Sequence, residues 1–308
     1  MIKRPKVAVV GSINMDLVIS SPRIPLAGET ILGKEFFTIP GGKGANQAVA
    51  ASRLGAEVAI IGCVGDDIFG KELLDQLNKE KICRNYVSVF PDVSTGVASI
   101  TVSEQGENCI VVSPGANYKL TPELVRKGED FIKEADILLV QLEVPLDAVD
   151  EAVRIANEHQ VKVILNPAPA KELPQSLLEK IDILTPNETE GKLLTTQWVD
   201  SNIDVEEIIR SLQKLGVKNV VITQGGEGVS YNDHHEIKHL PAYQVNVVDT
   251  TAAGDSFNAA LGISLAEGAS LTEAIQFAQK VAALTVTQFG AQTSLPYREQ
   301  VDQFKGEK

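Results

Sequence analysis

The chain alternates short apolar runs with longer amphipathic segments. Runs rich in Val, Ile and Leu occur at residues 6–10, 58–63, 137–142, 161–165, 181–184 and 217–223. Their nearly continuous hydrophobicity is typical of strands that are buried on both faces in a parallel sheet. Apolar residues at helical spacing occupy residues 45–54, 69–79, 122–133, 147–158 and 204–215. This alternation predicts a doubly wound α/β fold of three α/β/α layers, with helices on both faces of a mostly parallel sheet.

Two further stretches, residues 30–39 and 96–112, alternate apolar and polar positions like half-exposed antiparallel strands. The tetrapeptide EQGE at 104–107 is a candidate hairpin turn. We predict that strands inserted at about residues 14–40 and 95–113 form a small β-sheet lid over the carboxyl ends of the main strands. Because no linker-like or low-complexity run divides the chain, residues 1–308 are expected to form a single domain.

The acidic balance of the chain argues against two classes of partner. Of its 308 residues, 44% are hydrophobic and 22% are charged, and the formal net charge at pH 7 is −13. That charge would repel nucleic-acid phosphates and anionic lipid headgroups, so we expect neither nucleic acid nor membrane as a partner. The first apolar run, residues 7–10, is too short for a signal peptide or a membrane span. A cytoplasmic location is therefore expected.

The strongest chemical signal is DTTAAGDSF at residues 249–257, which we interpret as leaving an apolar strand and opening a helix over 258–267. Small side chains let backbone amides approach a ligand, and a helix N-terminus favours the negative charge of a transferring phosphoryl group. Asp255 is placed to accept a hydroxyl proton, and the positive helix end should favour its ionised form. The alternative is an ordinary helix start with Asp255 as a first-turn charge.

A glycine-rich segment, PGGKGANQA, occupies residues 40–48. Its glycines permit close backbone approach, and Lys43 and Asn46 offer donors to sugar hydroxyls. A Walker A loop is excluded, because Phe37 and Gly44 stand where that motif needs Gly and Ser or Thr. The alternative is a glycine turn before a helix.

These two segments resemble the signatures of the ribokinase family of carbohydrate kinases. DTTAAGDSF is similar to its carboxyl-terminal signature, and GGKGANQA is similar to the signature near its amino terminus. The resemblance implies transfer of the γ-phosphoryl group of ATP to the 5-hydroxyl of D-ribose, with Mg²⁺ and a monovalent cation, K⁺. It assigns the role of general base to Asp255 and an anion hole to Ala252, Ala253 and Gly254.

Two segments at predicted strand ends resemble the family's sugar-binding turns. GSINMD at residues 11–16 offers Asn14 and Asp16 to hydroxyls, and QLEVP at 141–145 offers Glu143. Ordinary turn formation and helix capping are the alternatives. The first turn is no dinucleotide fingerprint, because Ile13 and Asp16 occupy its second and third glycine positions. The sugar-binding residues implied by the resemblance are Ser12, Ile13, Asn14, Asp16, Gly42, Lys43, Gly44, Ala45, Asn46, Glu143 and Asp255.

The remaining resemblances concern the nucleotide and its metals. TPNETE at residues 185–190 resembles the family's NxxE motif, in which Asn187 and Glu190 would hold Mg²⁺ through water. The same spacing is typical of a helix capping box, and both interpretations can be true. TQGGEG at residues 223–228 resembles the nucleotide-binding loop, or forms a β-turn. The implied nucleotide-binding residues are Asn187, Thr223, Gln224, Gly225, Gly226, Glu227, Gly228, Gly254 and Gln279. The implied K⁺ ligands are Asp249, Thr251, Thr285, Gln288, Gly290 and Ser294.

The family resemblance also suggests a homodimer joined through the lids, because exposed edge strands would otherwise be open to unwanted pairing. Ser256, where the family often has Thr, and Gln279, at a position facing adenine, are small departures that leave the chemistry intact. Other members of the family act on fructose, deoxyribose or adenosine and share the carboxyl-terminal motif; GGKGANQA and QLE favour ribose. A non-catalytic sugar sensor and an oxidoreductase are the alternatives from other classes.

Overall fold

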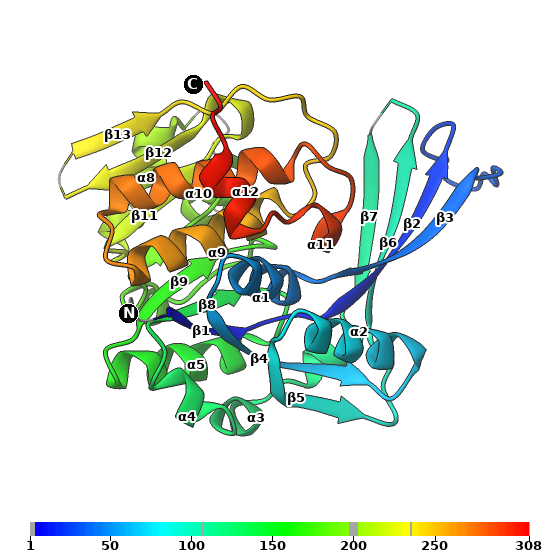
Figure 1. Ribbon diagram of the computed structural model, residues 1–308, viewed down its shortest axis with the longest axis horizontal. Coiled ribbons are helices and arrows are strands. Elements are labelled where there is room, and N and C mark those ends of the chain that lie inside the picture. The colour runs from blue at the N-terminus through cyan, green and yellow to red at the C-terminus, as the bar shows by residue number, and fades with distance from the viewer. Residues whose placement is uncertain (1–3, 106, 197–202, 235, 308) are drawn as a thin grey trace.

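The computed structural model describes residues 4–105, 107–196, 203–234 and 236–307. Within these ranges, a large sheet of nine strands has the order β13-β12-β11-β10-β9-β8-β1-β4-β5 (Figure 1). Neighbouring strands from β5 to β11 run parallel, and the β12–β13 hairpin completes the sheet in antiparallel fashion. The strands are β1 Lys6–Val10, β4 Glu57–Gly65, β5 Cys83–Phe90, β8 Ile137–Gln141, β9 Lys162–Asn166, β10 Ile183–Leu184, β11 Asn219–Thr223, β12 Val229–Asp233 and β13 Glu236–Leu240.

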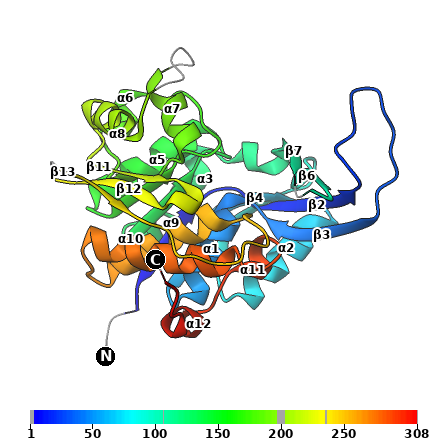
Figure 2. The same cartoon turned by 90° about the horizontal axis from the view of Figure 1, so that it is seen from above.

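Helices cover both faces of this sheet, as Figure 2 shows from above. One face carries α1 Lys43–Arg53, α2 Ile68–Lys79, α9 Ala253–Ala266, α10 Leu271–Thr285, α11 Ala291–Ser294 and α12 Arg298–Gln303. The other face carries α3 Pro122–Arg126, α4 Glu129–Ile132, α5 Leu146–Glu158, α6 Gln175–Leu178, α7 Glu188–Thr196 and α8 Val205–Lys214.

Each strand serves two hydrophobic cores, because successive side chains of a strand point to opposite faces. In β1, Val7 and Val9 pack into the core beneath α1 and α9, whereas Ala8 and Val10 pack into the core beneath α5. All four are almost completely buried. The sheet is therefore apolar on both sides, as the unbroken hydrophobic runs predict.

A second sheet of four strands, in the order β3-β2-β6-β7, projects from this body on the right of Figure 1. It consists of β2 Asn14–Ser21, β3 Glu35–Gly41, β6 Gly96–Ser103 and β7 Asn108–Ser113. β2 pairs parallel with β6, and the other pairs are antiparallel. The predicted three-layer fold with a small β-sheet lid is confirmed.

Three predicted elements differ from the structure. The expected helix at 122–133 is divided into α3 and α4 near Gly128, where an added Cβ would lie 2.7 Å from the Ile61 side chain. The expected strand at 30–39 begins only at Glu35, since the preceding residues form a loop in which Leu32 is exposed. The segment before Asp249, interpreted as a strand, is an irregular loop. Of the candidate turn at 104–107, Gly106 lies outside the described residues.

Candidate active site

The DTTAAGDSF segment forms a tight turn that leads into α9. Ala252, the N-cap residue, has φ +61°, in the left-handed region that side-chain-bearing residues seldom adopt. The amides of Gly254 and Asp255 follow in the first turn, where an α-helix has no internal acceptors for its N–H groups. The sequence prediction of a helix start here is confirmed, and Ala252, Ala253 and Gly254 line a cavity beside it.

The GGKGANQA segment forms the start of α1, directly against the first turn of the chain. Gly42, the N-cap, has φ +89°, and a Cβ there would lie 2.6 Å from the Asn14 amide nitrogen. A Cβ on Gly44 would lie 2.6 Å from the carbonyl carbon of Gly11. Neither position has room for a side chain, so the two glycines allow the two predicted sugar-binding segments to meet.

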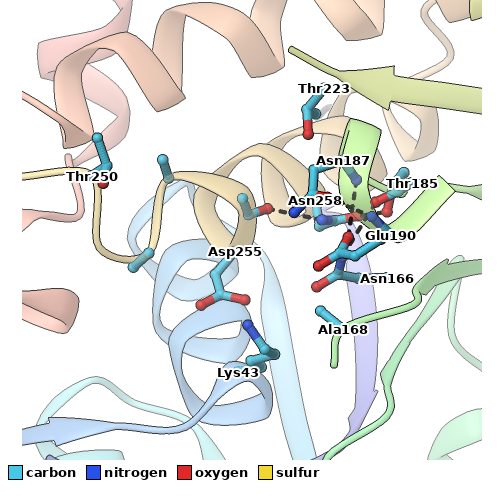
Figure 3. Close-up of a pocket in the computed structure, with 13 residues that line it drawn as sticks. Lys43, Asn166, Ala168, Thr185, Asn187, Glu190, Thr223, Thr250, Asp255 and Asn258 are labelled. Carbon is cyan, nitrogen blue, oxygen red and sulfur yellow. Dashed lines mark hydrogen bonds between the residues drawn. The ribbon is translucent and has the colours of Figure 1, made fainter. Parts of the chain in front are cut away.

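Helices α1 and α9 meet at Asp255, whose carboxylate is almost completely buried. The Asn46 Nδ2 group donates to its Oδ2 at 2.9 Å, and the Gln47 Nε2 group donates to its Oδ1 at 3.2 Å. The Lys43 side chain points toward the same carboxylate (Figure 3). The structure thus brings Lys43, Asn46 and Asp255 together as the motifs predict. Gln47 is a partner that we did not predict.

Burial controls the protonation of this group of residues. It raises the pKa of Asp255 above its ordinary value, against the opposing influence of Lys43 and of the Asn46 and Gln47 amides. Desolvation is the largest influence on this pKa, so the positive helix end, which we expected to favour the ionised form, does not set the net direction of the shift. Burial would lower the pKa of Lys43, but the carboxylates of Asp255 and Glu143 raise it, so its ammonium group stays charged.

Glu143 gathers the predicted sugar-binding residues at the end of β8. Its Oε2 accepts from the Ser12 hydroxyl at 2.5 Å, the Lys43 amide at 3.4 Å and the Asn14 Nδ2 group at 3.5 Å. Asp16 is also buried, and desolvation together with the charge of Glu143 raises its pKa to about 7. These side chains form one polar cluster that adjoins Asp255.

Asn117 supports this cluster and was not predicted. Its Nδ2 group donates to the Asn14 Oδ1 atom at 2.6 Å, and its Oδ1 accepts from the Ile13 amide at 2.9 Å. The Ala45 amide likewise donates to the Ser12 carbonyl at 2.9 Å. The Ile13 and Ala45 amides are therefore used within the protein. Nothing in the local sequence around Asn117 distinguishes it from an ordinary turn residue.

A polar cavity of about 200 Å³ lies in front of Asp255 (Figure 3). Asn187 and Glu190 form a reciprocal capping box at its edge: the Asn187 amide donates to Glu190 at 2.9 Å, and the Glu190 amide donates to Asn187 at 2.8 Å. Burial raises the pKa of Glu190. The cavity is lined by Lys43, Asn166, Ala168, Thr185, Asn187, Glu190, Thr223, Thr250, Ala252, Ala253, Gly254, Asp255 and Asn258. Of these, Asn166, Ala168, Thr185, Thr250 and Asn258 were not predicted as site residues.

These oxygen-bearing side chains fit a hydrated Mg²⁺ better than a fully dehydrated one. The described residues contain no group of three or more His, Cys, Asp or Glu that could hold a metal ion directly. Mg²⁺ commonly keeps several waters and takes one or two carboxylates together with phosphate oxygens. Asn187 and Glu190, already oriented by the capping box, supply a donor set of that kind.

A second cavity of about 350 Å³ adjoins the first. Both cavities are lined by Thr223, Thr250, Ala253 and Gly254, so they meet at the start of α9. The second is lined by Thr223, Gly225, Gly226, Gly228, Val229, Ala242, Tyr243, Gln244, Val245, Val247, Thr250, Ala253, Gly254, Phe257, Gln279, Ala282, Ala283 and Val286.

Some of the residues that line the second cavity were predicted to bind the nucleotide, and others were not predicted. Gln279 lines it and donates to the backbone carbonyls of Leu240 and Pro241 at 3.0 and 3.2 Å. Gln224 and Glu227 do not line it; the Gln224 Oε1 atom instead accepts from Ser230 at 2.6 Å. The wall at residues 242–247 was missed, because its apolar residues were interpreted as part of a strand.

The proposed monovalent-cation segments lie against each other beside α9. One oxygen of Asp249 accepts from the Thr251 amide at 2.9 Å and the Thr251 hydroxyl at 2.6 Å, and the other accepts from the Gly290 amide at 2.9 Å. The Thr285 and Ser294 hydroxyls donate to the carbonyls of Val281 and Ala291, and the Gln288 amide donates to the Thr285 carbonyl. Asp249 thus ties the turn before α9 to the loop after α10.

Among the described residues, no helix has the length and hydropathy needed to cross a membrane.

Comparison with known proteins points to one family. The model of pfkB family carbohydrate kinases matches residues 4–298. A ribokinase of Haemophilus influenzae is 43% identical over 301 residues, which cover 98% of each chain. A deoxyribokinase of Salmonella typhimurium is 37% identical over 299 residues, which cover 97% of this chain and 98% of that one.

Two solved structures that contain ligands match this chain in fold. Arabidopsis thaliana ribokinase complexed with ribose and ATP matches with a TM-score of 0.89 and 33% identity, over 98% of this chain and 100% of that chain. An Escherichia coli structure in complex with ATP and Mg²⁺ matches with a TM-score of 0.81 and 26% identity, over 97% of this chain and 98% of that chain. Because the family model matches this chain over almost the whole length of the chain, the chain belongs to the pfkB family of carbohydrate kinases and is a phosphotransferase.

Proposed function

We propose that this kinase transfers the γ-phosphoryl group of ATP to the 5-hydroxyl of D-ribose. The observation that carries the proposal is the polar cluster of Asn14, Asp16 and Glu143 next to Lys43 and Asp255. A hydroxyl-rich sugar can satisfy such a set of donors and acceptors, whereas a nucleoside base would need an apolar or aromatic slot. The ribokinase of H. influenzae and the ribose complex of A. thaliana support the same substrate.

Asp255 is the proposed general base. As the sugar 5-oxygen bonds to the γ-phosphorus, its proton passes to the Asp255 carboxylate, and the bond to the bridging oxygen of ADP breaks. The backbone amides of Ala252, Ala253 and Gly254 are the proposed anion hole for the charge that develops on the phosphoryl oxygens. One of them is partly committed, since the Ala253 amide donates to the Thr250 carbonyl at 3.2 Å.

The sugar-binding assignment follows the cluster. Asn14, Asp16, Lys43, Asn46 and Glu143 are proposed to bind hydroxyls through their side chains. The remaining assigned residues, Ser12, Ile13, Gly42, Gly44 and Ala45, are proposed to hold the two turns together, because their hydrogen bonds or close backbone contacts already lie within the protein.

ATP is assigned to the larger cavity, with its phosphates directed toward the start of α9. The glycines of the loop at 223–228 would let the nucleotide approach the backbone closely, and Gln279 also lines this cavity. Asn187 and Glu190 are the residues that would position Mg²⁺ through water. When bound, Mg²⁺ would neutralise part of the phosphate charge, in addition to Lys43 and the proposed anion hole.

K⁺ is assigned to the Asp249 and Thr251 turn, with backbone carbonyls of the loop around Gln288 and Gly290. A cation there would hold this turn next to the anion hole, which begins one residue after Thr251. A homodimer is proposed through the lid sheet, whose large apolar side chains are exposed, among them Ile19, Phe36, Phe37, Ile110, Val111 and Val112.

The deoxyribokinase of S. typhimurium supports a second candidate, 2-deoxyribose. An ATP-consumption screen over ribose, 2-deoxyribose, fructose and adenosine, with Mg²⁺ and K⁺ present, separates the two. A site built to bond a 2-hydroxyl rejects the analogue that lacks it, because its own polar groups are left unpaired. Ribose should have the highest kcat/KM. A preference for 2-deoxyribose, fructose or adenosine would refute the ribose assignment while leaving the kinase assignment in place.

A further inference from the structure

Two buried glutamines connect the central sheet to Asp255. Gln141 ends β8 and Gln47 lies on α1; both are at most 1% exposed. The Gln141 Nε2 group donates to the Gln47 Oε1 atom at 2.7 Å, and the Gln47 Nε2 group donates to the Asp255 Oδ1 atom at 3.2 Å. Three elements, β8, α1 and α9, are thus joined by one chain of side-chain hydrogen bonds.

The order of donors in this chain fixes the direction of the Gln47 amide. An amide has one accepting end and one donating end, and Gln141 occupies the accepting end of Gln47. The donating end must then face Asp255. Because Asn46 donates to the other carboxylate oxygen at 2.9 Å, each oxygen has one protein donor and keeps accepting capacity for a sugar hydroxyl.

The two buried glutamines lower the stability of the fold. Polar side chains buried in an apolar core destabilise the fold unless their groups are paired. Gln141 Oε1 is buried and has no hydrogen-bond partner among the described residues. Gly11 makes room for it, since a Cβ at that position would lie 2.0 Å from this oxygen. An apolar residue at 141 or 47 would fill the same space without that cost, so space filling alone does not account for the two amides.

We propose that Gln47 is a positioning residue, which Gln141 orients so that its N–H group holds the Asp255 carboxylate in place and favours its ionised form. The proposal rests on the proposed role of Asp255 as the base. Gln47 itself need not touch the sugar or the nucleotide. Its effect is transmitted through Asp255.

The charges around Asp255 explain why a neutral donor is useful there. Lys43 on α1 is the cation that faces it, and the carboxylates of Glu143 after β8, Asp16 on β2 and Glu190 on α7 oppose its ionisation. Burial acts in the same direction as these carboxylates. A second amide donor stabilises the carboxylate without adding a charge that must itself be balanced.

The test compares two substitutions of similar shape with a control. Gln47→Met fills the space but removes the donor; Gln47→Glu keeps the shape but places a carboxyl group beside Asp255. Gln76→Met makes the same chemical change on α2, where the amide donates to the Glu80 carboxylate at 3.3 Å, away from the candidate site. The readouts are kcat, sugar KM and the pH profile of kcat/KM, with Tm measured alongside.

For Gln47→Met we expect kcat at neutral pH to fall by about tenfold, in line with loss of one hydrogen bond to a charged group. Sugar KM should change by less than about threefold, the acidic limb of the profile should move to higher pH, and activity should recover in alkali. Gln47→Glu should lose more activity at neutral pH, because two adjacent carboxyl groups share a proton. Gln76→Met should resemble the wild type.

Gln141→Met tests the same series of hydrogen bonds without altering the contact between Gln47 and Asp255. It also replaces Gln47→Met as the test if that variant does not fold. It should move the profile in the same direction by a smaller amount, and the double variant should be no worse than Gln47→Met alone, since the two act in series. Additive losses, or a rate loss equal at every pH, would overturn the proposal. Failure of the proposed function would instead be seen in the wild-type sugar screen or in an active Asp255→Asn variant.

Discussion

Replacement of Asp255 by Asn tests the central chemical assignment. The substitution keeps the shape of the side chain but removes the basic oxygen that would take the sugar proton. General acid–base catalysis contributes roughly 10²- to 10⁴-fold, so kcat should fall by that factor. The loss corresponds to about 3–5 kcal/mol in the activation barrier.

The structure also sets the expected cost to folding. Both Asp255 oxygens accept amide hydrogens, from Asn46 and from Gln47. An Asn side chain offers one oxygen and one NH₂ group, so one of these donors would face another donor. An unsatisfied buried donor costs about 1–3 kcal/mol, partly offset because a buried charge is removed. A modest fall in Tm is therefore expected, with the protein still folded.

The assay must separate rate from binding. Steady-state kcat from ATP consumption, sugar affinity from calorimetry and Tm from thermal unfolding should be measured on Asp255→Asn and on Asp75→Asn, a matched change at an exposed position of α2. Bound sugar with a kcat near that of the wild type would show that Asp255 is not the base. A large loss of sugar affinity with kcat unchanged would instead assign Asp255 to binding.

Three further predictions concern other parts of the molecule. K⁺ should raise kcat above its value in a bulky organic cation at equal ionic strength, and Asp249→Ala should remove that difference; equal wild-type rates in both salts would exclude the K⁺ site. The pKa of Asp16 is raised from 3.8 to about 7, so the folded state holds a proton that the unfolded state has released. Stability should therefore fall as pH rises from about 4 to 7. In Asp16→Asn this contribution should disappear, so a pH dependence of Tm unchanged from the wild type would contradict the assignment. Arg53 bonds Glu80 at 2.6 and 3.1 Å and two backbone carbonyls beside α11 at 2.7 and 2.8 Å. A lysine cannot reproduce these several hydrogen bonds of the guanidinium group, so Arg53→Lys should lower the free energy of unfolding in urea by about 2–4 kcal/mol. A loss below about 0.5 kcal/mol would show that these contacts are redundant.

The fold was predictable where one physical pattern dominates. Strands such as β1 and β8 are apolar along their whole length because both faces are buried, and the sequence shows this directly. The edge strand β5, with the sequence CRNYVSVF, has only half-buried and exposed positions, lacks that pattern and was missed. The loop before Asp249 was wrongly interpreted as a strand, because its apolar residues Val245 and Val247 line a cavity instead of pairing in a sheet.

The sequence predicted the charged residues of the candidate site but not the amide side chains that hydrogen-bond to the site residues. Segments rich in glycine and other small residues at helix starts are unusual enough in sequence to be noticed, and Lys43 and Asp255 were identified in two such segments that resemble family signatures. Gln47, Asn117 and Gln141 act through the direction of an amide group. That direction depends on partners far away in sequence, and no local pattern encodes it.

The hydrogen bond between Asn46 and Asp255 joins positions 209 residues apart. Chains are synthesised from the amino terminus, so α1 emerges long before α9, which begins at Ala253. Until α9 packs against α1, the candidate site has the residues that α1 contributes but lacks Asp255, the adjoining turn and one wall of each cavity. A nascent or prematurely terminated chain that lacks α9 therefore carries only part of the candidate site, and the site can be completed only late in synthesis.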